Sequence, residues 1–482
     1  MRNDFPSNQL SFYQVPIDEI VIDFYSNDEM AMTLLGIQEI YKNKKLRSDV
    51  LTLISGDLEK GKTSKFGAKG LSLWEVFVLL MIRRAGIVDY NKLSDLAENH
   101  LILLGIMGHG HSGDIRFPVS TIHENITKIK PDTIDEINIL IVKHHHKSSK
   151  SALNMVRADS FVFESNIHLH ADYVSLYDGA RCLMREASRL ACLCGIEGFR
   201  KYKSVIKKSK RLSYKVTQVK KSKKKKKVDD LFGALIDLLN HTQGVMDRVL
   251  KLLDDTISWE SEKDNENVKY TKLRNKLIYF LSGTALEHEL THRRRILGET
   301  LSSKEKIFSL FEPHTELIMK GKSKAPVEYG HLVFVAQDSD GFMLTGSRVE
   351  SGSRDKDICI PEIKNLQDSY GEIKCITFDK GFCNPANKAA IRELIDDYYL
   401  PSSGNQDKEE RTDKFYGKKH WHSGVESSIN ALEQGNNLGV CRDKGLDGFD
   451  RCIAASIASR NLLTLGRKIA KKKIKKLKKK AA

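Results

Sequence analysis

The chain has 482 residues, of which 40% are hydrophobic and 29% charged. This length exceeds what one compact core holds, so we expect about two to four structural units. It has neither an apolar run near the roughly 20 residues of a membrane span nor an apolar signal-peptide segment at its start, which argues against a membrane protein and for a cytoplasmic one. Its formal net charge of +16 indicates a polyanionic partner.

Residues 1–150 are expected to form a helical domain. Apolar residues at helical spacing predict two helices joined by a short turn, over 71–86 and 89–105. Helix pairs beside an enzymatic domain either dock DNA or simply pack against their neighbours. We interpret this domain as a DNA-end binding region, with simple packing as the open alternative.

A second helix pair follows in the same domain. Thr121 and Glu124 have the spacing of a capping box, and Pro131 suits the first turn of the next helix. That helix ends in the histidines 144–146. A consecutive triplet on a helix cannot direct three ligands at one ion, so we expect an exposed, solvated run.

Residues 151–184 change to a strand pattern and are expected to begin an α/β catalytic core. In the segment 153–165, Phe161 and Phe163 share a face with Asp159 while Val162 lies on the other, which predicts a strand buried on both sides. We interpret Asp172, which follows the strand, as part of a structural ion pair rather than of a DNA path.

Residues 185–305 return to helical periodicity and are expected to be a helical insertion. It carries a lysine cluster at 219–227, and a second cluster forms the basic tail 467–482. Lysines at this density bind polyanions by releasing counterions. The alternatives are that both clusters are solvated and disordered, or that the tail lies as a helix on an anionic surface.

Residues 306–466 are expected to complete the core. Two apolar runs separated by residues 338–341 predict a hairpin, and residues 373–379 predict a strand that stops at Asp379. A helix from Pro385 through Tyr399 follows, and Glu426 begins a further helical stretch. Strand, insertion, hairpin, strand and helix in this order are typical of an interrupted mixed α/β sheet.

Asp159, Asp379 and Glu426 are the candidate catalytic residues and metal ligands. Strand, strand end and helix are where a ribonuclease-H-like nuclease places its acids. Two divalent cations about 3.5–4 Å apart activate the attacking oxygen and stabilise the leaving one. Hard cations take oxygen ligands and Mg²⁺ retains several waters, so three carboxylates suffice, with Mn²⁺ as an alternative ion.

Four segments resemble bacterial insertion-sequence transposases of the DDE type. They are ADSFVFESNIHLHADYVSLYDGARCLMR, FEPHTELIMKGKSKAPVEYGHLVFV, ITFDKGFCNPAN and HSGVESSINALEQGNNLGVCRDKGLDGFDRCIAASIASRNLLTLG. The resemblance implies an RNase H-like core split by an insertion, with Asp159, Asp379 and Glu426 as the metal-binding triad. It also implies a homo-oligomer, at least a dimer, that acts on double-stranded DNA at terminal inverted repeats and at a target, in the cytoplasm and associated with the nucleoid.

The third acid lies in surroundings that differ from the family's. Relatives often have Tyr and Arg seven and four residues before this Glu and Lys seven after it, where this chain has Lys419, His422 and Glu433. His422 would share a helix face with Glu426 if the helix extends back that far. The predicted DNA contacts are Lys320, Lys322, Lys380, His422, Arg442 and Lys444.

The sequence thus predicts a DNA transposase that cleaves at element ends and transfers the 3′-hydroxyl into target DNA. Two alternatives stay open. A nuclease of the same fold would hydrolyse DNA without joining it, and a non-catalytic DNA-binding protein would turn nothing over.

Overall fold

The structure is a computed structural model that describes residues 2–6, 14–59, 70–86, 88–110, 115–221, 227–259, 264–302, 305–319, 327–402, 404 and 408–481. The chain divides into two compact units, one formed by residues 1–166 and 318–482 and the other by residues 167–317. We call them the sheet unit and the helical unit. The second is inserted into the chain of the first.

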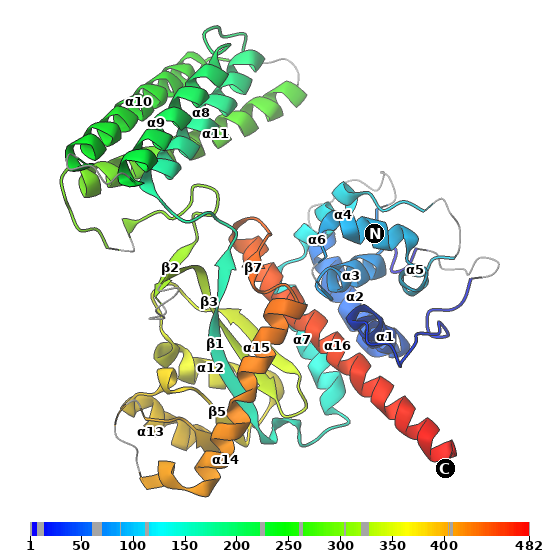
Figure 1. Ribbon diagram of the computed structural model, residues 1–482. Helices are drawn as coiled ribbons and strands as arrows, with labels where there is room; N and C mark the ends of the chain where they lie inside the picture. The colour runs from blue at the N-terminus through cyan, green and yellow to red at the C-terminus, as the bar shows by residue number, and fades with distance from the viewer. Residues whose placement is uncertain are drawn as a thin grey trace. The chain divides into compact units, whose positions relative to one another are not determined.

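The sheet unit begins with helices (Figure 1). Those before the first strand are α1 (Glu29–Lys42), α2 (Lys44–Leu58), α3 (Leu73–Ile82), α4 (Tyr90–Asn99), α5 (Leu101–Met107), α6 (Val119–Lys128) and α7 (Pro131–His146). Every residue of α3 is buried, which explains why its apolar residues cover more than one face. Ser72 and Glu75 close its N-terminus as a capping box. The helical character of this region is as predicted.

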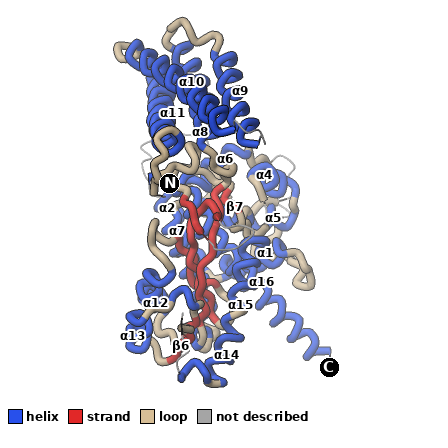
Figure 2. Tube along the Cα trace, turned by 60° about the vertical axis from the view of Figure 1, so that its left-hand side comes forward, coloured by secondary structure: helices blue, strands red, loops and turns tan. Residues whose placement is uncertain are grey.

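A mixed seven-stranded sheet lies among the helices of this unit (Figure 2). Its strands are β1 (Val156–Ser165), β2 (Glu316–Met319), β3 (Val327–Asp338), β4 (Met343–Arg348), β5 (Cys375–Thr377), β6 (Asp397–Tyr399) and β7 (Val440–Cys441). The order is β2-β3-β1-β5-β6, with β4 paired to β3 and β7 to β1. β1 is antiparallel to β3 and parallel to β5, and β5 is parallel to β6.

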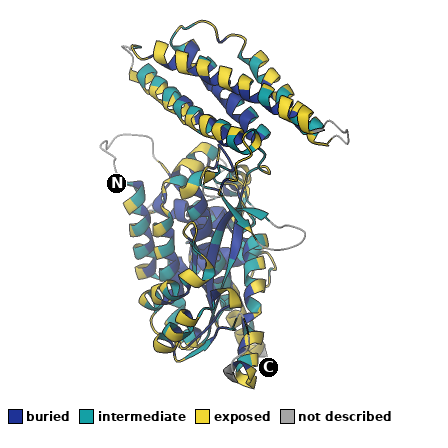
Figure 3. Cartoon of the chain, turned by 90° about the vertical axis from the view of Figure 1, so that its left-hand side faces the viewer, coloured by how far each residue is buried: buried dark blue, intermediate teal, exposed yellow. Residues whose placement is uncertain are grey.

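Helices cover both faces of β1. The later helices of the sheet unit are α12 (Asp355–Tyr370), α13 (Pro385–Leu394), α14 (Asp413–His422), α15 (Gly424–Gly435) and α16 (Gly445–Ala481). Phe161 and Phe163 pack with residues of α15 and α16, whereas Val156 and Ala158 belong to a cluster that includes residues of α12. β1 is accordingly buried or half-buried along its length, and much of the sheet is drawn as buried in Figure 3. The two-sided burial predicted for this segment is confirmed.

The helical unit consists of α8 (Asp172–Leu193), α9 (Tyr202–Lys221), α10 (Lys227–Asp255) and α11 (Asp264–Arg295). α8 packs against the other three helices, and its Leu183 and Leu190 share a core with Val249 of α10 and Leu277 of α11. The unit therefore includes α8 and starts earlier than residue 185. Most of the lysine cluster at 219–227 lies outside the described residues, whereas the basic tail continues α16 as a helix.

Three local predictions are wrong, each for a physical reason. The segment 89–105 forms two helices because His100 adopts an extended backbone and caps α5. α6 begins at Val119 after Pro118, so Thr121 lies inside the helix and caps nothing. The helix from Pro385 ends at Leu394, because the following residues pair with β5 as β6. Pro131 occupies the first turn of α7, as predicted.

The histidine run at the end of α7 is not solvated. His145 Nε2 lies 2.6 Å from Asp340 Oδ2, and His146 Nε2 lies 2.8 Å from Asp338 Oδ2, with side chains 11% and 15% exposed. These pairs join α7 to the end of β3 and to the turn that follows it. Burial lowers the pKa of His145 although Asp340 opposes the shift. Among the described helices, none combines the length and apolar character that crossing a membrane requires.

Candidate active site

Asp159 lies within β1, directly opposite Val335 of β3. Side chains alternate along a strand, so Asp159 is on the face of Phe161 and Phe163, toward α15 and α16. Its Oδ1 accepts a hydrogen bond of 2.8 Å from the Ser160 N–H. A central strand with neighbours on both sides gives this carboxylate a rigid support.

Asp379 and Glu426 come from two other elements of the sheet unit. Asp379 follows β5, the parallel neighbour of β1, and precedes the short turn η3 (Lys380–Phe382). Glu426 is in the first turn of α15. Both side chains are exposed, and neither forms a hydrogen bond or ion pair with any residue that the structure describes. Both carboxylates are therefore available to a ligand from solvent.

The charges of the other two predicted acids act on Asp159. Burial raises the pKa of Asp159 to about 7, against the opposing hydrogen bond from Ser160. Three neighbouring negative charges reinforce the increase, those of Asp379, Asp355 and Glu426. Like charges gathered without a cationic side chain favour either protons or metal ions. The structure thus brings together the acids that the sequence singled out.

Asp355, the first residue of α12, is an additional acid that the sequence reasoning missed. Its Oδ1 accepts a hydrogen bond of 2.5 Å from Ser160 Oγ. Burial raises its pKa, the Ser160 hydrogen bond opposes this, and the charge of Asp379 adds to it. A Cβ at Gly381 would lie 3.0 Å from Asp355 Oδ2, so the glycine lets η3 approach this carboxylate. Asp355 lies in the polar segment SGSRDKD, where nothing signals a partner 195 residues away.

His422 occupies the interior rather than the surface. It is 9% exposed, and its Nδ1 lies 3.0 Å from Thr377 Oγ1. Burial lowers its pKa, opposed by the charge of Asp379. α14 ends at His422 and α15 begins after Ser423, so the shared helix face with Glu426 is interrupted. This position argues against the DNA contact that the sequence predicted and for a role in holding the strand before Asp379.

The remaining predicted DNA contacts are dispersed. Lys320 and Lys322 lie outside the described residues. Lys380 is exposed directly beside Asp379. Arg442 and Lys444 are exposed in the segment between β7 and α16, where both line a cavity.

The acid group is open rather than compact. In the described part of the chain, the ligand oxygens of Asp159, Asp379 and Glu426 do not all lie within 4.8 Å of one another. Two ions about 3.5–4 Å apart, each about 2.1 Å from its ligands, require a wider ligand set than one ion does. All three candidate ligands are carboxylates, the oxygen donors that hard cations such as Mg²⁺ take.

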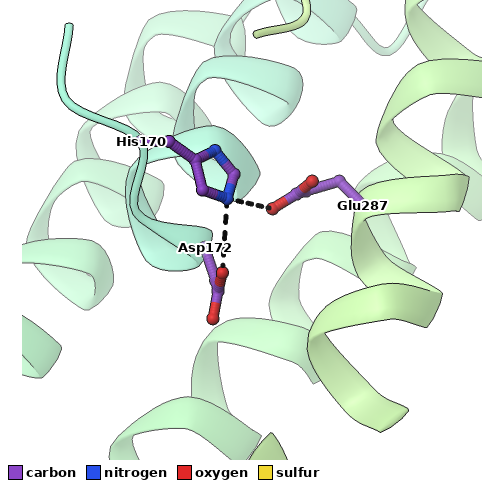
Figure 4. A group of neighbouring side chains, drawn as sticks. All are labelled: His170, Asp172 and Glu287. Carbon is purple, nitrogen blue, oxygen red and sulfur yellow. Dashed lines mark ion pairs between the residues drawn. The ribbon is translucent and has the colours of Figure 1, made fainter. Parts of the chain in front are cut away.

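A compact group of possible ligands occurs elsewhere, in the helical unit. It consists of His170, Asp172 and Glu287, shown in Figure 4. Asp172 is already paired with Arg294 at 2.9 Å and Arg295 at 2.6 Å. An ion here would have to displace both guanidinium groups, so internal pairing explains this group better than a metal does.

Glu287 completes this second group. Burial, reinforced by the charge of Asp172 and opposed by Arg294, raises the pKa of Glu287 to about 9. The carboxyl is therefore protonated at neutral pH, and its 3.9 Å separation from His170 Nε2 is not an ion pair under that condition. A metal ion would also have to remove this proton.

No protein family, curated protein or solved structure matches this chain. Functional assignment therefore rests on the residues and their geometry.

Proposed function

We propose that the chain is a DDE-type DNA transposase with an RNase H-like core, in which Asp159, Asp379 and Glu426 hold two divalent cations. The observation that carries the proposal is the convergence of these carboxylates, from a central strand, the end of its parallel neighbour and a helix, without a cationic partner in the described part of the chain.

The sheet supports the proposed core. Without the additional strands β2 and β7, the order is β4-β3-β1-β5-β6, with three antiparallel strands followed by two parallel ones. A ribonuclease-H-like nuclease places its acids on a strand, at a strand end and on a helix, and Asp159, Asp379 and Glu426 occupy positions of these kinds. The insertion enters the chain between β1 and β3, far in sequence from the third acid.

The bound ions and the surrounding side chains would have separate roles in the reaction. Bound Mg²⁺ would supply Lewis-acid activation of the attacking oxygen and stabilisation of the leaving one. Asp159, half-buried on a rigid strand, would fix the position of the site, and the exposed Asp379 and Glu426 would leave room for a phosphodiester. Asp355 would hold Ser160, the neighbour of Asp159, through its hydrogen bond, and it lies close to Gly381 of η3.

The proposed substrate is double-stranded DNA, at the inverted ends of the element and at a target. A homo-oligomer, at least a dimer, would bring two ends together. The positive net charge supports a nucleic-acid partner, and α16 carries exposed lysines along its last turns. With Asp159 near half-protonation at pH 7, ion binding and cleavage should both increase from pH 6 to pH 8.

The test uses purified full-length protein and a plasmid that carries the DNA flanking its coding sequence on both sides. We expect Mg²⁺-dependent cleavage at the two ends, and joining of pre-cut ends to a second plasmid. Asp379→Asn should abolish both reactions but retain DNA binding. Asp368→Asn, an exposed acid of α12, is the matched control and should retain both.

The outcomes separate the three candidate functions. Cleavage without joining of pre-cut ends would identify a nuclease. Binding without either reaction in the wild type would identify a non-catalytic DNA-binding protein. Cleavage that persists in purified Asp379→Asn protein would refute the assignment of the site.

A further inference from the structure

A basic cavity of about 480 Å³ lies in the sheet unit, away from the acid group in sequence and on different elements. Its walls come from the end of α3, from α4 and α6, and from the segment that leads from β7 into α16. They include Arg83, Tyr90, His123, Arg442, Lys444 and Arg451. We call it the arginine cavity.

Two buried arginines at this cavity share one carboxylate. Arg83 Nη1 donates to Asp443 Oδ2 at 2.9 Å, and Arg84 Nη2 donates to the same oxygen at 2.6 Å. Arg83 also stacks over the Tyr90 ring at 3.9 Å. The Nε atoms of both arginines are buried without a hydrogen-bond partner. One carboxylate therefore balances two guanidinium groups and leaves a positive charge.

Arg451 adds a third buried guanidinium. The residue is 9% exposed, and within the described residues its single hydrogen bond is from Nε to Ile129 O at 2.6 Å. Burial lowers its pKa, with the charge of Asp443 opposing. The charge of Asp447 opposes the shift as well. Within the described residues, neither Nη group of Arg451 donates a hydrogen bond, so both are available to an anion.

The nearby carboxylates do not balance the excess. Asp89, Asp443 and Asp447 line the cavity, so three carboxylates face four basic side chains there. Arg84 does not line the cavity but adds a further positive charge through its pair with Asp443. Asp89 is exposed and already accepts the Lys92 N–H that it caps. α16 begins at Gly445, so the positive end of a long helix lies at the same place. All these contributions favour an anion.

We propose that the arginine cavity is a phosphate-binding site in which Arg442 and Arg451 contact the phosphate oxygens. Guanidinium groups match phosphate geometry with paired hydrogen bonds and remain charged when partly desolvated. The phosphate comes either from a nucleic-acid backbone or from a free phosphate compound. A nucleic-acid source rests on the proposed function, whereas the phosphate-binding site itself is independent of that function.

The first experiment measures the binding of inorganic phosphate to the full-length protein. We expect phosphate to raise the apparent Tm by about 2 °C or more over chloride at equal ionic strength, once it is well above its Kd. Arg442→Gln, at an exposed position, and Arg451→Gln should each remove the increase. Arg451→Lys should restore part of it. Arg411→Gln, an exposed arginine of η4 (Lys408–Arg411), is the matched control and should keep it.

The second experiment separates the two sources. The affinity for a 30-base-pair duplex is measured over a range of salt concentrations without divalent ions, so that cleavage plays no part. If the phosphate belongs to DNA, Arg442→Gln should weaken binding and reduce the slope of log K against log salt by about 1. An unchanged slope together with a lost phosphate response would indicate a free phosphate compound. Variants that match the wild type in both assays would overturn the site, whatever the cleavage assay shows.

Discussion

The two carboxylate groups of this protein differ in how their charge is balanced. In the helical unit, His170, Asp172 and Glu287 lie close together, and two arginines and a retained proton neutralise them. In the sheet unit, Asp159, Asp379 and Glu426 are more widely spaced and have no cationic partner among the described residues. Compactness alone is thus a poor guide to a metal site, because a satisfied group has no need of an ion.

The largest expected effect is on catalysis. Asp159→Asn should lower the rate of Mg²⁺-dependent DNA cleavage by about 10³-fold or more, because the ions lose the ligand at the base of the site. Asp172→Asn should change the cleavage rate of the folded protein by less than about threefold. Single-turnover cleavage at saturating DNA measures both rates. Equal losses in the two variants would contradict the proposed difference between the two carboxylate groups.

The next effect is on stability, where the substitution at Asp172 should cause a greater loss than the one at Asp159. Asp172→Asn should lower the free energy of unfolding of the helical unit by about 3 kcal/mol, because Arg294 and Arg295 lose their shared counterion. Urea unfolding followed by hydrogen exchange in α8 and α11 measures the change. A loss below about 0.5 kcal/mol would show that this group does not hold the unit together.

Asp159→Asn should instead stabilise the metal-free protein at pH 8, by about 1–2 kcal/mol. The folded pKa of about 7 lies above the ordinary value of 3.8, so the unfolded chain releases its proton first and stability falls as pH rises between these values. The variant should lack this fall. Urea unfolding at pH 5 and pH 8 in the presence of a chelator tests it, and an equal pH dependence of both proteins would contradict it.

The smallest effect concerns Glu287→Gln. Because the carboxyl is protonated up to a pKa of about 9, the amide should change stability by less than about 0.5 kcal/mol at pH 7. Above pH 9 the wild type has to accommodate a buried charge and should become the less stable of the two. Thermal unfolding at pH 7 and pH 10 gives the comparison, and a large loss at pH 7 would mean that Glu287 is ionised there.

Sequence patterns anticipated the features that depend on neighbours along the chain. The two-sided burial of β1, the hairpin of β3 and β4, and the strand that ends before Asp379 follow from apolar spacing and turn residues. The hydrogen-bond partners of the acids cannot be predicted from such patterns, because Asp355 bonds to Ser160 across 195 residues and His146 to Asp338 across 192. The burial of His422 was not anticipated for the same reason, since its partner Thr377 lies 45 residues before it.

The most direct measurement is a Mn²⁺ titration followed by electron paramagnetic resonance. We expect two ions to bind to the wild type and to the Asp172→Asn protein, and binding to be lost or reduced to one weak ion in Asp379→Asn. Asp368→Asn should bind as the wild type does. Two ions retained by Asp379→Asn but lost from Asp172→Asn would place the metal in the helical unit and contradict the assignment.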